Sequence, residues 1–218
     1  MKMAVTVGCT IKFANIYWRV LEIKNKKALL ISKKILEVHP YHTESTEVTW
    51  KDCALREYLN EDFFRRFDKK SRMAVSNKII TNSDNPWYGT SGGYQTVDSV
   101  FILSLEEVAK YFGDSGALEQ KIGNRIHYFY VKNKKNIQIS KPNLKEWCSF
   151  SDQFNNARIA YDSAGKAQRW WLRGAGDSER HATYVFDNGT VDVGGVSVNT
   201  EYHNVHCYGV RPALWLNL

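Results

Sequence analysis

Several common sequence features are missing from this chain, and each absence removes a class of protein. No run approaches the roughly 18 apolar residues that a membrane helix needs, and residues 1–10 lack the charged start and apolar run of a signal peptide. We therefore expect a protein without a membrane partner, located in the cytoplasm or, for a viral gene, in the virion. GxSxG, phosphate-loop and HExxH motifs are also missing, so nothing favours hydrolase or nucleotide chemistry.

Cysteine and proline are scarce, with four residues of each among 218. The cysteines lack the paired CxxC spacing of a structural zinc site, so we expect free, mostly buried thiols and neither a metal nor another cofactor. The prolines stand singly, and no stretch rich in Pro, Gly or Ser separates two halves, which favours one domain over residues 1–218. These residues are Cys9, Cys53, Cys148 and Cys207, and Pro40, Pro86, Pro142 and Pro212.

Aromatic residues and basic charge are abundant. The chain has 7 Trp, 12 Tyr and 10 Phe, enough for a well-filled core because each enclosed ring buries roughly 150 to 250 Å². The formal net charge is +7, and much of the excess lies in lysine runs at residues 24–27, 33–34, 69–70 and 132–135. We expect solvated turns or faces there, with a nucleic-acid groove as the disfavoured alternative.

Local patterns in the first half predict one hairpin and several short helices. Residues 16–23 and 28–36 read as two strands around a polar turn. Apolar residues at spacings of three and four predict a helix over 50–59, followed by a helical piece over 61–67. Residues 81–97 favour a long loop, and residues 99–103 a buried strand. Ser104 and Glu107 form a capping box that opens a helix over 105–112, which Gly113 ends.

The second half favours antiparallel strands. Residues 126–139 contain strand-like residues around a basic turn, and residues 151–161 suggest a short helix. The Asn188-Gly189 turn between residues 182–186 and 190–193 predicts a hairpin, because Asn-Gly readily supplies positive φ. A final strand is expected over 210–216, with Pro212 at an edge or at the strand's beginning. Helices early and antiparallel strands late imply an α+β fold with a mainly antiparallel sheet.

A series of ordered motifs resembles an uncharacterised bacterial and phage domain family over residues 16–216. That family is in turn distantly similar to the C-type-lectin-like fold of formylglycine-generating enzymes and of the variable proteins of diversity-generating retroelements. The resemblance implies a C-type-lectin-like α+β fold in which loops between fixed flanks make the ligand surface. The motifs are Trp18, Val20-Leu21, residues 28–32, Thr49-Trp50, Leu55-Arg56, Leu59-Asn60, residues 100–104, the WWLR motif at 170–173 and the GVRPAL motif at 209–214.

The flanking motifs supply four candidate structural residues, Trp170, Trp171, Arg173 and Arg211. Tryptophans in a strand usually pack in the core. The planar guanidinium forks of the two arginines are able to hold backbone carbonyls or a carboxylate. We therefore expect these residues to fix the scaffold and not to contact a ligand.

The candidate ligand surface combines the loop at 82–93 with residues 174–208. Its residue types suit adaptable contact, because Tyr gives amphipathic area at low entropy cost and polar side chains give flexible hydrogen bonds. The same types are reached from asparagine codons by changing adenines, as in retroelement-diversified proteins, but they also accumulate in ordinary loops. For Trp87, burial in the core is the alternative. The candidates are Trp87, Tyr88, Tyr94, Asp177, Arg180, His181, Tyr202, His203, Asn204, His206 and Tyr208.

Two further interpretations concern the segment around Cys207. His203, His206 and Cys207 form an HxxHC pattern, but a zinc site needs further converging ligands, and no partner pair is visible. Cys148 and Cys207 lack the surrounding pattern of formylglycine-generating oxidases, so we favour a non-enzyme over a divergent oxidase. We predict a non-enzymatic module that binds a protein or glycan surface, with the oxidase and a basic nucleic-acid binder as alternatives.

Overall fold

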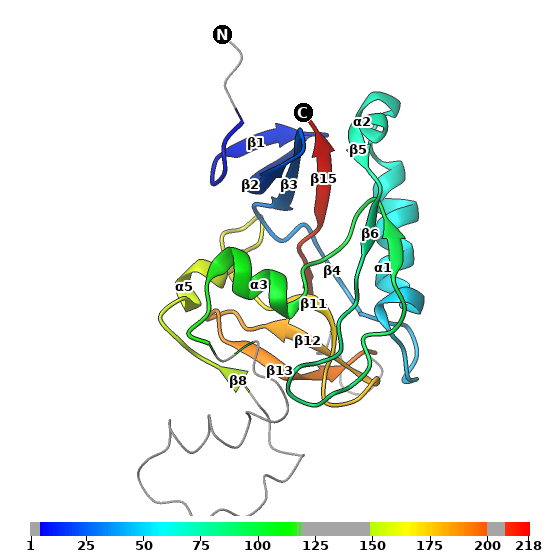
Figure 1. The fold of residues 1–218 in the computed structure, drawn as a ribbon, viewed down its shortest axis with the longest axis vertical. Coiled ribbons are helices and arrows are strands. Elements are labelled where there is room, and N and C mark those ends of the chain that lie inside the picture. The colour runs from blue at the N-terminus through cyan, green and yellow to red at the C-terminus, as the bar shows by residue number, and fades with distance from the viewer. Residues whose placement is uncertain (1–4, 117, 119–148, 200–207) are drawn as a thin grey trace, which may run out of the picture.

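The computed structural model describes residues 5–116, 118, 149–199 and 208–218. These residues form two main sheets and several short helices, so the chain is an α+β protein, as predicted. In Figure 1 the five-stranded sheet occupies the upper part, the six-stranded sheet the lower part, and α1 and α2 run along the right side. The segment 126–139, for which strand-like structure was predicted, lies outside the described residues.

The five-stranded sheet joins the two ends of the chain, because the last strand pairs with β3. The predicted hairpin of β2 and β3 is confirmed, and its turn places Asn25 at φ 51° and Lys26 at φ 58°. β3 ends at Ser32, earlier than residue 36, since the Ile35 and Leu36 amides donate to carbonyls elsewhere in the fold. In spatial order the strands are β1 (Thr10–Phe13), β2 (Ile16–Lys24), β3 (Lys27–Ser32), β15 (Ala213–Asn217) and β5 (Val75–Ser76).

The six-stranded sheet is mixed, with one parallel pairing between β14 and β11. The predicted hairpin of β12 and β13 is confirmed, and Gly189 has φ +82° in its turn. A Cβ at Gly189 would lie 2.0 Å from the Asn155 carbonyl oxygen, so both conformation and space require glycine. In spatial order the strands are β4 (Glu37–His39), β14 (Tyr208–Val210), β11 (Trp170–Ala175), β12 (His181–Val185), β13 (Val191–Ser197) and β8 (Ser149–Phe150).

The predicted final strand over 210–216 is wrong in one respect, because it is two strands in two different sheets. β14 ends at Val210 and β15 begins at Ala213, so Arg211 and Pro212 carry the chain from one sheet to the other. Pro212 lacks the N–H that a continuous ladder needs, while its carbonyl accepts the Ser32 amide at 2.8 Å. The crossover therefore binds the two sheets together.

The predicted helices lie where they were expected, but the first of them is less regular than predicted. The helix expected over 50–59 is broken after η1, because Cys53 has an extended backbone with ψ 146°, and α1 then continues into a π-helical turn from Leu59. The capping box of Ser104 and Glu107 is present, and α3 ends before Gly113. The helices are η1 (Trp50–Asp52), α1 (Ala54–Tyr58), the π-helical turn η2 (Leu59–Phe63), α2 (Lys69–Ala74), α3 (Leu105–Phe112) and α5 (Asn155–Arg158).

The segment before α3 is not the predicted strand. Residues 100–103 are fully buried, but only Phe101 pairs, in an isolated bridge with Ala213. The predicted loop over 81–97 is mostly irregular and ends in a short strand that pairs with the strand preceding the loop. The remaining strands are β6 (Lys78–Ile80) with β7 (Thr96–Asp98), and β9 (Ala160–Tyr161) with β10 (Ala167–Gln168).

A continuous hydrophobic core contacts both main sheets. Five tryptophans are at most 1% exposed, and they provide its largest side chains. In the part of the chain that the structure describes, no helix is long and apolar enough to cross a membrane. The buried tryptophans are Trp18, Trp50, Trp87, Trp170 and Trp171.

Candidate functional site

The WWLR motif lies on β11 and connects it to three other segments. The Trp170 indole donates to the Arg158 carbonyl at 3.1 Å, and the Trp171 indole donates to the His39 carbonyl at 2.8 Å. Both rings are fully buried. The indole N–H is the only polar group of each ring, and in both it has the hydrogen-bond partner that a buried indole requires. These tryptophans pack inside the molecule and leave the ligand surface to other residues.

Arg173 connects β11 to the start of α3. Its Nη1 donates to the Ile102 carbonyl at 2.7 Å and to Oε2 of Glu107 at 2.6 Å. The same Glu107 oxygen accepts the Ser104 amide of the capping box at 3.0 Å. One carboxylate thus serves a helix cap and a buried arginine, and it fixes the end of β11 against α3.

Arg211 has a different environment at the crossover between the sheets. Its Nε donates to the Ser32 carbonyl at 3.1 Å, and its guanidinium lies over the rings of Trp170 and Phe112 at 5.1 and 5.3 Å. Burial lowers the pKa of Arg211 to about 9, because desolvation penalises the charged form. The arginine holds the crossover through one carbonyl and two aromatic faces.

Asn85 attaches the loop at 82–93 to the six-stranded sheet, and the sequence analysis missed it. Its Nδ2 donates to the Ala175 and Val193 carbonyls, both at 2.8 Å. Its Oδ1 accepts the amides of Trp87 at 2.8 Å and Tyr88 at 3.2 Å. The side chain is 3% exposed and uses its full hydrogen-bonding capacity. The sequence predicted only a long loop here, because both acceptor carbonyls lie about 90 residues or more away in sequence.

The loop is also closed on itself by small residues. Asn82 Nδ2 donates to the Tyr94 carbonyl at 2.7 Å, and Asp84 Oδ1 accepts the Gly92 amide at 3.0 Å. A Cβ at Gly92 would lie 2.3 Å from the Ser83 carbonyl oxygen, so the two arms of the loop approach too closely for a side chain. These contacts give the loop a defined shape without regular secondary structure.

The turn between β11 and β12 lies at the same end of the sheet. The Asp177 amide donates to the Gly194 carbonyl at 2.8 Å, which holds the turn against β13. The Val48 amide donates to the Glu179 carbonyl and the Val198 amide to the Arg180 carbonyl, both at 3.0 Å. Three segments distant in sequence therefore meet at one end, at the lower right of Figure 1. We call this the loop-rich end; it comprises residues 42–51, 82–94, 176–181 and 194–199.

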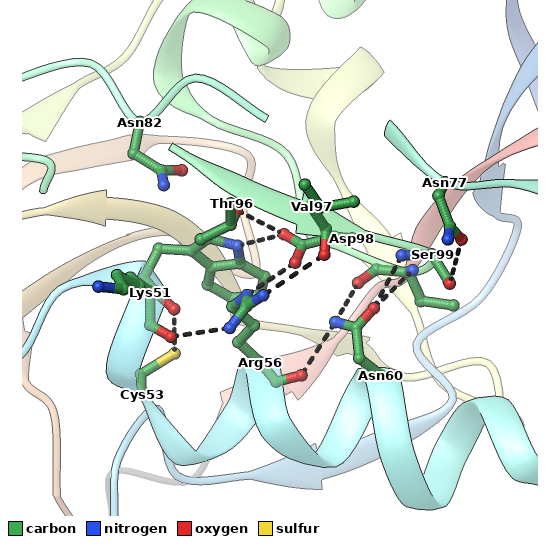
Figure 2. Close-up of polar contacts among 12 residues, drawn as sticks. Lys51, Cys53, Arg56, Asn60, Asn77, Asn82, Thr96, Val97, Asp98 and Ser99 are labelled. Atoms are coloured by element: carbon green, nitrogen blue, oxygen red, sulfur yellow. Dashed lines mark hydrogen bonds and ion pairs between the residues drawn. The ribbon is translucent and has the colours of Figure 1, made fainter. Parts of the chain in front are cut away.

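A buried carboxylate supports the part of the loop-rich end that precedes β7. Asp98 is fully buried, and it accepts the Trp50 indole at 2.9 Å, the Thr96 hydroxyl at 2.8 Å and Arg56 Nε at 2.7 Å (Figure 2). Arg56 also donates to the Lys51 carbonyl at 2.9 Å. Lys51 Nζ in turn lies 5.2 Å from the centre of the Tyr94 ring. This network was not predicted, because its members come from two segments about 40 residues apart, 50–56 and 94–98.

The same face is joined to the helical segment by Asn60. Its Nδ2 donates to the carbonyls of Arg56 and Val100, and its Oδ1 accepts the amides of Ser99 and Val100, as Figure 2 shows. Like Asn85, this asparagine supplies hydrogen-bond partners to backbone N–H and C=O groups of an irregular segment, where no neighbouring strand supplies them. These bonds hold the segment after β7 against the helical segment, while Tyr94, before β7, is 79% exposed.

The structure separates the predicted ligand-binding residues into three groups. Tyr94, Asp177 and Arg180 are exposed at the loop-rich end, where Tyr88 and His181 are half-buried. His181 Nδ1 lies 2.5 Å from Asp177 Oδ1, and Arg180 Nε lies 3.7 Å from Glu47 Oε1. The loop-rich end therefore presents an aromatic ring together with charges of both signs.

Trp87 and Tyr208 do not belong to this surface. Trp87 is fully buried, with its ring 4.6 Å from that of Phe150. Tyr208 is 4% exposed and packs 4.6 Å from Trp171 and 4.7 Å from Tyr184. Burying a large aromatic ring in the core is more favourable in free energy than leaving it in water, and tertiary packing decided the position of both rings. Tyr202, His203, Asn204 and His206 lie outside the described residues.

The Cys53 thiol is buried and does not face the loop-rich end as a free thiolate. Burial raises the pKa of Cys53 to about 12, so its thiol stays protonated at neutral pH, and its Sγ lies 3.4 Å from the Trp50 carbonyl. Among the residues that the structure describes, no group of three or more His, Cys, Asp or Glu is placed to hold a metal ion. Cys148 and Cys207 lie outside these residues.

Comparison with known proteins gives a family without an assigned activity. Residues 25–218 match the family described as "Domain of unknown function (DUF6273)". A search of the curated proteins found no match, and a search of the solved structures found none. The match covers both flanking motifs and the whole loop-rich end.

Proposed function

The chain belongs to the DUF6273 family, and we propose that it is a non-enzymatic binding module whose loop-rich end contacts the surface of a protein or a glycan. The expectation of an uncharacterised domain family is confirmed by this membership. The observation that carries the proposal is the convergence of three loops, each fixed from beneath by a buried side chain or a backbone contact.

Rigid support is what a recognition surface needs. Ordering a loop during binding costs free energy, so a loop that is already held in place binds more tightly for the same contacts. Asn85 makes four hydrogen bonds that hold the loop at 82–93, and Asp98, at the end of β7, accepts three, from Trp50, Arg56 and Thr96. Both side chains are buried and occupied within the chain, which favours a supporting role.

The exposed residues have the composition of a contact surface. Tyr and Arg are enriched among the residues that contribute most to protein interfaces, and here they are Tyr94 and Arg180. Lys51 and the Asp177–His181 pair add polar groups around them. Adaptable hydrogen-bonding groups around an aromatic ring suit a polar partner such as a glycan or a protein surface.

We also propose that the fold is a variant of the C-type-lectin-like fold. Two features support this proposal: the last strand, β15, pairs with β3 of the N-terminal hairpin, and buried tryptophans and arginines flank the loops. The proposal predicts that an experimentally determined structure of a related retroelement variable protein superposes on β11 to β15 with its ligand-binding loops at the loop-rich end. A superposition that places those loops elsewhere contradicts it.

The binding proposal is tested by site-specific photo-crosslinking in cells that contain the natural partner, together with a glycan array. A benzophenone amino acid replaces Tyr94 in one variant and Tyr17 in a matched control, because Tyr17 is also exposed, at 59%, but lies on β2. We expect a defined crosslinked species from position 94 alone, or array binding that Tyr94→Ala and Arg180→Ala abolish. The proposal would be contradicted if both positions crosslink equally and if, in addition, the array shows no binding that depends on Tyr94 and Arg180.

A further inference from the structure

A second surface feature lies apart from the loop-rich end. A groove of about 580 Å³ lies between the β2–β3 turn, β6, α3 and β15, and it shares no residue with the loop-rich end. Its volume is in the range of small-molecule sites, roughly 300 to 1,000 Å³. Its charged lining residues are Glu22, Lys24, Lys27, Lys78, Glu107, Lys110 and Arg173, and the side chain of Trp215 also lines it.

The two acidic residues of this groove are already neutralised within the chain. Glu22 Oε2 lies 2.7 Å from Lys110 Nζ and accepts a hydrogen bond from the Tyr111 hydroxyl. The hydrogen bond from Lys110, with that from Tyr111, lowers the pKa of Glu22 below its ordinary value. Glu107 is paired with Arg173, as described above. Both carboxylates are therefore occupied by partners within the chain.

Three further lysines line the groove, and of these Lys24 acts on Glu22 through its charge, contributing less to the lowered pKa than the Lys110 and Tyr111 hydrogen bonds do. Among the described residues, no ion pair includes Lys24, Lys27 or Lys78. Lys27 Nζ donates to the Ser76 hydroxyl at 2.6 Å, and Lys78 Nζ lies 5.6 Å from the centre of the Trp215 ring. Five cationic and two acidic side chains line the groove, which gives it a net charge of +3. The lysine run at 24–27 thus forms part of a concave site as well as a turn.

We propose that this groove binds a small anion that carries two or more negative charges, as phosphate or carboxylate groups. Lys24 and Lys27 line it at the β2–β3 turn and Lys78 lines it on β6, so three lysines from two parts of the fold border one groove. Lysine is a compact point charge that suits such groups. A nucleic-acid strand would need a basic track longer than one groove of this volume. The proposal is independent of the proposed function, because the two sites share no residue.

Titration calorimetry and tryptophan fluorescence at low salt test this proposal, with pyrophosphate, citrate and decathymidylate as the three probes. We expect saturable binding of pyrophosphate or citrate, and the stronger of the two identifies the preferred group. Lys78→Glu and Lys24→Glu should each weaken that binding by about tenfold or more, since each removes a cation and adds a repulsive charge. Lys166→Glu is the matched control, because it changes net charge equally at an exposed turn outside the groove.

Trp215 provides a local readout. Anion contact with Lys78 should change the indole emission, and Trp215→Phe should remove the change while calorimetric binding persists. The proposal is overturned if neither small anion binds saturably, if Lys166→Glu weakens binding as much as Lys78→Glu, or if the fluorescence change survives in Trp215→Phe. Tighter binding of decathymidylate than of both small anions would also overturn it, in favour of a nucleic-acid track.

Discussion

Arg173 and Arg211 belong to the two flanking motifs and are almost equally buried, at 5% and 4% exposure, yet their surroundings differ. Arg173 contacts a carboxylate and backbone carbonyls at the end of β11. Arg211 contacts one carbonyl and two aromatic rings at the crossover, and none of the ion pairs among the described residues includes it. The two arginines are therefore equally buried, but only Arg173 has a carboxylate partner. The partner decides whether a buried cation stabilises the fold.

The largest effect is expected at Arg173. Arg173→Met keeps the length of the side chain but leaves the carboxylate of Glu107 and the Ile102 carbonyl without their donor. We expect a loss of about 3 kcal/mol in the free energy of unfolding, because the partly buried carboxylate of Glu107 and the buried Ile102 carbonyl both lose a charged donor. Urea unfolding measures it, with Arg173→Lys as an intermediate control. A loss below about 1 kcal/mol would place this pair with ordinary surface ion pairs.

A smaller effect, dependent on pH, is expected at Asp192, a second buried charge in the six-stranded sheet. Burial raises the pKa of Asp192 above its ordinary value of 3.8, and the side chain is 1% exposed. As pH rises from about 4, the unfolded chain releases this proton before the folded chain does, so the group makes the fold less stable with rising pH.

Asp192→Asn should remove this pH dependence. Relative to the native chain, the variant should gain stability between pH 4 and neutral pH and show no gain below pH 4. The difference between the two unfolding free energies, measured across that range, isolates Asp192 from carboxylates with lowered pKa, such as Glu22 and Asp152. A difference that is constant with pH would show that Asp192 titrates normally.

The smallest effect is expected at Arg211. Arg211→Met removes one hydrogen bond to Ser32 but also removes a buried charge whose burial lowers its pKa to about 9. The two contributions oppose each other, so we expect a change below about 1 kcal/mol in urea unfolding at neutral pH. Arg173→Met serves as the matched comparison. Equal losses in both variants would abolish the distinction between the two arginines.

Local elements were predictable because their determinants lie within a few residues of one another. The turns of both hairpins contain residues that tolerate positive φ, namely Asn25 and Gly189. The capping box needs only residues 104 and 107, and both of its hydrogen bonds are present. The helix over 50–59 was less accurate, since apolar spacing does not reveal that Cys53 is extended.

Long-range choices were not predictable from the same patterns. Nothing near Asn85 identifies the Ala175 and Val193 carbonyls as its acceptors, and nothing near Asp98 identifies Arg56 as its partner. Trp87 was assigned to both the surface and the core, because an aromatic residue in a polar loop is compatible with either position. Pairing over long sequence separations depends on how whole sheets are packed.

By itself, the sequence determined the α+β class, two hairpins, the capped helix and the family. The hairpins and the capped helix depend on the conformational preferences of a few adjacent residues, and the family on similarity over residues 25–218. Only the tertiary structure decided that Glu107 serves both a helix cap and Arg173, that Pro212 carries the chain between two sheets, and that the lysines at 24–27 border a groove. The physical reason is that burial and pairing are properties of position in space, and residues distant in the chain create that position together.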